Sequence, residues 1–206
     1  MFYFTKKPWI LKQIYGNVVW EMNEEEKSIY LTFDDGPHPT ETRFILDLLQ
    51  QYNAKGTFFC LGMNVENHPD IFEEVIKEGH SIGNHTFSHF DGWRTNQEKY
   101  FNDVTKASEL IKTKIFRPPY GHITRFEVKK LTENHHLKTI MWSIMAGDFD
   151  HKTSGEQCLH NVIDYAKPGS IVVFHDNDSA SKNMRYALPR ALDFFSNNGY
   201  SFKSIS

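Results

Sequence analysis

Two adjacent carboxylates, Asp34 and Asp35, occur in the segment LTFDDGP (residues 31–37), after an apolar run and before a Gly-Pro turn. Adjacent like charges raise each other's cost of ionisation unless a cation lies beside them. A metal ion is the usual remedy, because it replaces lost hydration and keeps both groups ionised. The same residues are also good turn formers, so the pair alone leaves both a turn and a metal site open.

A second set of metal-binding side chains occurs in the segment NHTFSH (residues 84–89). His85 and His89 are four residues apart, so on one helical turn both ring nitrogens would reach one cation. This spacing is weak evidence by itself, because the chain contains 11 histidines. Combined with the Asp pair, it supplies one carboxylate and two imidazoles and leaves positions for water. That set is typical of an open, catalytic Zn²⁺-type site, with Co²⁺, Ni²⁺ or Mn²⁺ as alternatives.

Two further segments carry residues suited to acid–base and anion-binding chemistry. In RPPYG (residues 117–121) the prolines lack N–H groups, so the next free donors belong to Tyr120 and Gly121, as an oxyanion hole requires. Arg117 is either a surface cation or the partner that keeps one Asp ionised. His175 ends an apolar run and is a candidate general acid, which Asp148 could stabilise in its protonated form.

The fold must bring these side chains together. Short apolar runs alternate with amphipathic stretches, which favours a parallel α/β sheet or barrel. In such folds, sites assemble at the carboxyl ends of the strands, where all of the residues above are expected. The predicted strands are residues 28–33, 56–61, 81–83, 115–116, 138–142, 170–174 and 201–205. The predicted helices are residues 40–52, 69–78, 95–113, 125–133, 156–166 and 183–198.

The composition narrows the classes of function. A chain of 206 residues without linkers or repeats is long enough for one domain with a sizeable core. Its net charge of −3 argues against nucleic acid or an anionic membrane as the main partner. Aromatic residues make up 15% of the chain, which suits core packing and also stacking on sugar faces. Cys60 and Cys158 form no CxxC motif, and we interpret both as buried thiols.

The amino-terminal residues form a separate question. Residues 1–11 are apolar and slightly basic but lack the h-region and cleavage site of a standard signal peptide. No apolar run approaches the ~20 residues of a transmembrane helix. We expect residues 1–27 to be a strap that packs on the domain rather than an interfacial anchor, and residues 28–206 to be a single domain. A cytoplasmic or membrane-peripheral location and the oligomeric state stay open.

The five segments, in this order, resemble the polysaccharide deacetylases of the NodB-homology type (carbohydrate esterase family 4). Residues 32–37 resemble the first motif, 85–89 the His-Ser/Thr-x-x-His motif and 117–121 the Arg-Pro-Pro-Tyr-Gly motif, while Asp148 and residues 173–175 match the fourth and fifth. The first three motifs together are highly specific. The resemblance covers roughly residues 29–206. It implies a distorted (β/α) barrel of about seven parallel strands and hydrolysis of N-acetyl groups on chitin-like or peptidoglycan-derived glycans.

The resemblance also implies a role for each residue at the metal. Asp35, His85 and His89 would bind one divalent ion, with Zn²⁺ as the expected metal. Asp34 would be the general base that takes a proton from water, and Arg117 would pair with it. These roles agree with the chemistry of amide hydrolysis, which needs a strong nucleophile and a polarised carbonyl group.

The remaining roles concern the leaving group and the substrate. By the resemblance, the Tyr120 N–H would help to hold the oxyanion, and His175 would be the general acid, tuned by Asp148. Phe149 and Val173 stand where the family often has Trp and Leu, and both would line the pocket for the acetyl methyl group. The residues assigned to substrate binding are Phe149, Val173 and Trp142. Met145 stands where the family commonly has Asp, and we assign it no role.

Two other functions stay open at this point. One is a related C–N hydrolase that acts on a glycolipid head group or on another small amide or imide. The other is a non-catalytic carbohydrate-binding protein, which would be expected to lack at least one of the chemical residues. None of these residues is missing from the sequence, so we favour the deacetylase.

Overall fold

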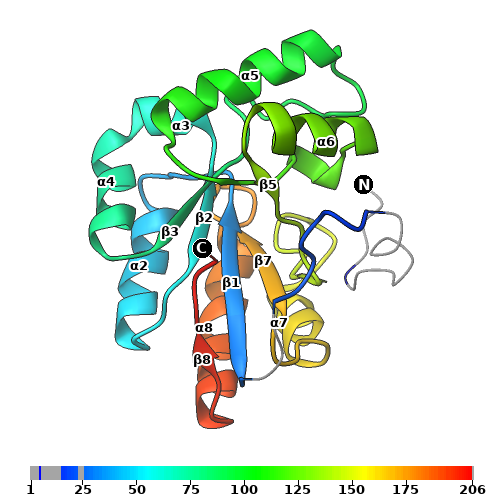
Figure 1. Ribbon diagram of the computed structural model, residues 1–206. Helices are drawn as coiled ribbons and strands as arrows, with labels where there is room; N and C mark the ends of the chain where they lie inside the picture. The colour runs from blue at the N-terminus through cyan, green and yellow to red at the C-terminus, as the bar shows by residue number, and fades with distance from the viewer. Residues whose placement is uncertain (1–4, 6–14, 23–25, 206) are drawn as a thin grey trace.

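The computed structural model describes residues 5, 15–22 and 26–205. A curled sheet of parallel strands forms its centre, and helices pack around this sheet (Figure 1). The strands are β1 (Ser28–Asp34), β2 (Thr57–Cys60), β3 (Ser81–Asn84), β4 (Ile115–Phe116), β5 (Lys138–Thr139), β6 (Ile144–Met145), β7 (Ile171–His175) and β8 (Ser201–Phe202). The helices are α2 (Glu41–Gln51), α3 (Gly62–Asn67), α4 (Pro69–Lys77), α5 (Gln97–Leu110), α6 (Arg125–Asn134), α7 (Gly155–Ile163) and α8 (Ser181–Asn197), with the short 3₁₀ helix η1 (Pro119–Gly121).

The strand order explains how distant motifs meet. The main path of the sheet runs β5-β4-β3-β2-β1-β7-β6 with parallel neighbours, and β8 pairs with the start of β1. This path of seven strands confirms the predicted α/β class and the distorted barrel. In the central strand β1, Asp34 is in register with Phe59 of β2 and with His175 of β7. The carboxyl ends of β1 and β7 therefore present their polar residues side by side.

Several short elements differ from the sequence-based prediction, and the predicted strand 201–205 ends at Phe202. The predicted strand 138–142 ends at Thr139, and a separate strand, β6, pairs with β7. The carbonyl groups of Ile140 and Met141 instead accept hydrogen bonds from the Arg117 side chain. Arg117 takes the place that a neighbouring strand would have as their hydrogen-bond donor. The helix α3 was not predicted, because six residues show too little periodicity.

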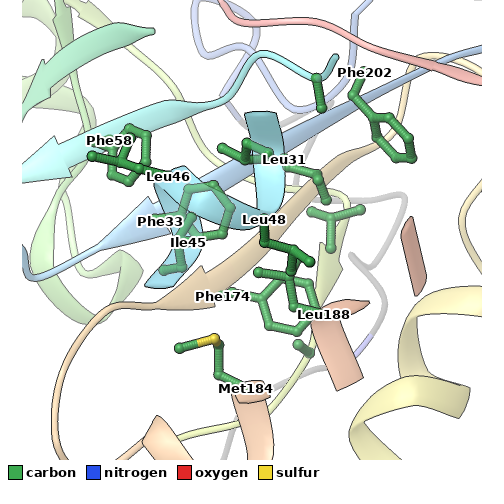
Figure 2. Packing of buried hydrophobic residues seen from close by; sticks show 14 of the residues in the cluster. Leu31, Phe33, Ile45, Leu46, Leu48, Phe58, Phe174, Met184, Leu188 and Phe202 are labelled. Carbon is green, nitrogen blue, oxygen red and sulfur yellow. The ribbon is translucent and has the colours of Figure 1, made fainter. Parts of the chain in front are cut away.

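The core lies on both faces of the sheet, as expected for buried parallel strands. Figure 2 shows one of these layers, in which Leu31 and Phe33 of β1 pack beside Phe174 of β7 and against helix α8 through Leu188. A second cluster fills the inside of the curl and includes Phe59 and Ile171. Cys60 and Cys158 are buried and free, which confirms the interpretation of both as buried thiols.

Part of the predicted strap lies along the sheet. Val19 forms a parallel bridge with Ile140, and the Met22 N–H donates to the carbonyl oxygen of Gly169 at 2.8 Å. Trp20 between them is buried. Residues 1–4, 6–14 and 23–25 fall outside the described part of the chain, and with them most of the segment considered as a leader or anchor. Within the described residues, no helix has the length and apolarity needed to span a bilayer.

Candidate metal and acid–base site

The predicted site residues gather at the carboxyl ends of the strands. There they surround a cavity of about 620 Å³. Of the residues singled out from the sequence, those that line it are Asp34, Asp35, His85, His89, Tyr120, Trp142, Met145, Phe149 and His175. The tertiary structure therefore brings all five sequence segments to one cavity, and the fourth segment also supplies the buried carboxylate of Asp148.

Three ligand atoms converge as a divalent ion would require. Asp35 Oδ1 lies 3.5 Å from His85 Nε2 and 3.2 Å from His89 Nε2, and the three ligand atoms all lie within 4.8 Å of one another. Asp35 Oδ1 is buried, yet no described residue makes a hydrogen bond to it. Burial alone would raise the pKa of Asp35, but the imidazoles of His89, His175 and His85 hold it well below its ordinary value. The donor set thus fits a cation with borderline ligand preference.

The loop after β3 positions His85 and His89 with a backbone conformation that differs from the prediction. The expected single helical turn is wrong, because Thr86 and His89 have left-handed φ angles of 68° and 59°. Asn84 Oδ1 accepts the Thr86 N–H at 2.8 Å, which starts the turn. The carboxylate of Asp103 on α5 accepts the next two N–H groups at 2.9 and 2.8 Å. These bonds to one carboxylate give the irregular loop a defined shape.

The protonation state of His85 follows from its partner. Its Nδ1 lies 2.7 Å from the carbonyl oxygen of Arg117, which can only accept, so Nδ1 carries the proton. Burial lowers the pKa of His85 to about 4, and the imidazole is neutral at pH 7. Its Nε2 lone pair therefore faces Asp35, as a metal ligand requires. His89 is held through Nδ1, which lies 3.1 Å from the Tyr120 hydroxyl oxygen.

Arg117 is fully buried and orients Asp34. Its Nη1 donates to Asp34 Oδ1 at 2.7 Å and to Thr32 Oγ1 at 2.7 Å. Its other donors reach the carbonyl oxygens of Ile140 at 3.3 Å and Met141 at 2.9 Å. The buried guanidinium fixes the orientation of the Asp34 carboxylate and leaves its second oxygen for the cavity.

His175 and Asp148 form the second charged pair. His175 Nδ1 lies 2.9 Å from Asp148 Oδ1, and Asp148 has no exposed surface. Burial opposes the positive charge on His175, but the adjacent Asp148 outweighs it and raises the pKa of His175 to about 9. The imidazole is therefore protonated at neutral pH, as a general acid must be.

The loop after β4 holds one unused donor. Gly121 donates its N–H to the Pro118 carbonyl at 3.0 Å, and His122 donates to Pro119 at 3.1 Å. The Tyr120 N–H donates to no described residue, and Tyr120 has a left-handed φ of 60°. Of the two N–H groups expected to be free, only that of Tyr120 is available.

Comparison with known proteins decides the family. The model of the polysaccharide deacetylase family matches residues 21–140. The chain is 37% identical over 197 residues to a peptidoglycan-N-acetylglucosamine deacetylase of Bacillus cereus, which covers 93% of this chain and 92% of that protein. The chain belongs to the polysaccharide deacetylase family.

Other relatives agree with this chain in sequence and fold. It is 34% identical over 161 residues to a chitooligosaccharide deacetylase of Rhizobium leguminosarum bv. trifolii, covering 76% of this chain and 74% of that one. The crystal structure of the Bc1960 peptidoglycan N-acetylglucosamine deacetylase matches with a TM-score of 0.87 and 32% identity over 96% of this chain and 94% of that one. A CE4 family pseudoenzyme of Bacillus anthracis shares the fold with a TM-score of 0.78 and 22% identity. Catalysis in this deacetylase family must therefore be argued from the site.

The three residues assigned to substrate binding differ in position. Trp142 and Phe149 line the cavity, and the Phe149 ring lies 4.9 Å from the His175 imidazole at 73°. Val173 is fully buried and is not among the cavity-lining residues, so its assignment to substrate binding stays a prediction. Side chains on a strand alternate, so Val173 shares the face of His175 but lies two residues deeper. Met145, its register partner on β6, lines the cavity instead.

The sequence-based reasoning missed several polar residues of this deacetylase site. Asn177, Asp91 and His122 also line the cavity. Asn177 follows His175 by two residues, and His122 directly follows the RPPYG segment, so proximity to a motif was the available signal. Asp91 follows His89 by two residues and gives the same signal, although its contact with His122 spans 31 positions.

Proposed function

We propose that this protein hydrolyses the N-acetyl amide of amino-sugar residues in chitin-like or peptidoglycan-derived glycans, and that it requires a divalent metal. The observation that carries the proposal is Asp35 Oδ1, which is buried without a hydrogen bond and faces two imidazole nitrogens at 3.2 and 3.5 Å. Leaving a buried carboxylate oxygen unpaired is costly, and a bound cation removes that cost. The peptidoglycan and chitooligosaccharide deacetylases among the relatives support the substrate class.

The metal would be held by Asp35, His85 and His89. The carboxylate and the neutral imidazoles favour Zn²⁺ and also admit Co²⁺, Ni²⁺ or Mn²⁺. When bound, such an ion lowers the pKa of water and polarises a carbonyl oxygen.

Asp34 acts as the general base. Its Oδ1 is occupied by Arg117 at 2.7 Å, and its other oxygen takes a proton from the attacking water as the water oxygen bonds to the amide carbon. Arg117 fixes the orientation of the carboxylate. The Tyr120 N–H donates to the carbonyl oxygen of the substrate as negative charge develops there.

His175 acts as the general acid. With Nδ1 held by Asp148 at 2.9 Å, its Nε2 carries the proton that passes to the amide nitrogen as the C–N bond breaks. The products are acetate and a free amino sugar. Phe149, beside the imidazole, and Trp142 limit the access of bulk water and shape the acyl pocket.

The experiment is an assay of acetate release from N-acetylglucosamine oligomers, with protein loaded with Zn²⁺ and with protein treated with a chelator. We expect release from the loaded protein, loss with the chelator and recovery when the metal is restored. Absence of release from every acetylated glycan by metal-loaded protein would overturn the proposal. Turnover of a small amide or imide in that case would identify a different C–N hydrolase, and glycan binding without turnover would identify a binding protein.

A further inference from the structure

An exposed indole lies beside the cavity and has no part in the chemistry above. The Trp93 side chain is 61% exposed, and its ring stacks on His122 with 3.9 Å between centroids and 5° between planes. Asp91 contacts both residues, since its Oδ1 accepts the backbone N–H of Trp93 at 2.9 Å and its Oδ2 lies 3.0 Å from His122 Nδ1. One carboxylate therefore fixes the backbone at Trp93 and the ring of His122, on which the indole stacks.

The rings of Tyr120, His122 and Trp93 form a series that extends away from the candidate metal site. The Tyr120 ring lies 4.6 Å from the ring of the metal-ligand residue His89 and 5.9 Å from that of His122. Trp93 ends the series on its outer side, stacked on His122. A glycan with its reacting sugar at the metal site extends beyond that site, and this series of rings marks a path for it.

The chemistry around Trp93 suits a sugar ring. A pyranose has apolar C–H faces and a rim of hydroxyl groups, and an indole offers a broad apolar face of matching kind. Polar groups for the hydroxyls stand next to it, namely the Asp91 carboxylate, the His122 imidazole and the exposed Arg94 guanidinium, all of which line the cavity. The ring is already held in place, so little conformational freedom is lost when a ligand stacks on it.

We propose that Trp93, supported by His122 and Asp91, is a sugar-binding subsite for a second ring of the glycan chain. This inference rests on the proposed function and adds to it a preference for oligomers over single sugars. In this proposal a single acetylated sugar occupies the metal site alone, whereas a longer chain also contacts Trp93.

The test compares Trp93→Ala with wild type on N-acetylglucosamine substrates of increasing length. We expect kcat/KM to fall about tenfold for long oligomers and to stay within about twofold for the shortest substrate that is turned over. Phe194→Ala is the matched control, because Phe194 is an exposed aromatic residue on α8 that is not among the residues lining the cavity. Equal losses at every length, or no loss at any length, would overturn the subsite.

A binding measurement separates this inference from the proposed function. Titration calorimetry with the Asp34→Asn variant, with and without Trp93→Ala, follows oligomer binding without turnover. Weaker binding in the double variant supports the subsite even if no acetate is ever released by wild type. Unchanged binding rejects the subsite even if the deacetylase activity is confirmed.

A separate observation concerns the second oxygen of Asp35. Asn177 Nδ2 donates to Asp35 Oδ2 at 2.7 Å. The orientation of the amide is determined, because Asn177 Oδ1 accepts the backbone N–H of Ala180 at 3.0 Å and the Ser179 hydroxyl at 2.7 Å. A backbone N–H can only donate, so the NH₂ group of Asn177 must face Asp35.

We infer that Asn177 is a positioning residue for the metal ligand. It occupies Asp35 Oδ2, so that Oδ1 alone faces His85 and His89. Partners of this kind orient the ligand, and their loss typically weakens metal binding by about 10–100-fold.

The test is the affinity of metal-free protein for Zn²⁺, measured by competition with a chelator. Asn177→Ser keeps a side-chain oxygen for the Ala180 N–H but is too short to reach Asp35, and we expect its affinity to fall about 10–100-fold. Ser179→Ala, which leaves the contact with Asp35 intact, should bind Zn²⁺ like wild type. Thermal unfolding of the metal-free variants checks that the fold is unchanged. Wild-type affinity in a folded Asn177→Ser variant would overturn the inference.

Discussion

Asp148 contacts His175 at two points, because its Oδ1 lies 2.9 Å from the imidazole Nδ1 and its Oδ2 accepts the His175 backbone N–H at 2.7 Å. Both contacts come from a side chain with no exposed surface. The ring orientation of His175, the proposed general acid, therefore depends on one carboxylate, which follows β6 while His175 ends β7, and the same carboxylate contributes most to the raised pKa of His175.

The first prediction concerns pH. The proposed acid works only when protonated, so turnover falls as the pH rises through the pKa of His175, which is about 9 in the wild-type protein. Asp148→Asn removes the opposing charge while burial still disfavours the imidazolium. We expect the alkaline limb of kcat to move to lower pH by roughly 1–3 pH units. Profiles of acetate release against pH measure the shift, and coincident limbs would reject the tuning role.

The second prediction separates metal binding from proton transfer. Asp34→Asn should bind Zn²⁺ within a few-fold of wild type but lose turnover by about 10²–10⁴. His85→Ala should lose both properties, because Nε2 is a ligand atom. Chelator competition and acetate release measure the two properties separately. Normal turnover by Asp34→Asn would show that another group is the base.

The third prediction concerns the buried guanidinium. Arg117→Ala leaves Asp34 as an unpaired buried carboxylate, so we expect the free energy of unfolding to fall by about 3–5 kcal/mol. Arg94→Ala is the control, since that side chain is exposed and should change stability by less than about 0.5 kcal/mol. Urea denaturation of both variants gives the comparison. Equal effects would mean that the Asp34–Arg117 pair adds nothing to stability.

The fourth prediction concerns the turn after the two aspartates. A Cβ atom at Gly36 would lie 2.0 Å from Asp176 Oδ2, and Asp176 is buried with that oxygen bonded to the Thr42 hydroxyl at 2.5 Å. Gly36→Ala should therefore cost about 1–3 kcal/mol of unfolding free energy. Gly16→Ala meets nothing within 4 Å and should be nearly neutral. A Gly36→Ala variant as stable as wild type would mean that this turn can move freely.

The fifth prediction concerns metal removal. Zn²⁺ that binds only the folded protein stabilises it, by about 4 kcal/mol at 1,000 times its Kd. The thermal midpoint of metal-free protein should therefore rise when Zn²⁺ is added. His89→Ala should show a much smaller rise, because a ligand atom is missing. A wild-type midpoint that is independent of Zn²⁺ would argue that no ion binds at these residues.

The sequence predicted the helices and strands well where the pattern of apolar residues is local. The alternation of apolar strands and amphipathic helices gave the α/β class, and the bounds of α2 and α4 differ from the prediction by one residue at most. The pattern failed at residues 138–142, where the carbonyl groups of Ile140 and Met141 bind Arg117 instead of extending a strand. The side chain of Arg117, which follows strand β4, decides where this strand ends. No local sequence pattern indicates such a contact.

The sequence by itself determined which residues are able to do the proposed chemistry, because Asp34, Asp35, His85, His89 and His175 carry their ligand and proton-transfer properties in their side chains. Only the tertiary structure decided how they meet. The two histidines converge through left-handed backbone angles in a loop rather than a helical turn, and Val173 lies below the cavity that it was expected to line. The partners Asn177 and His122 became visible only through contacts across many positions. Side-chain chemistry is a property of each residue, whereas these distances result from sheet register and loop packing between distant segments.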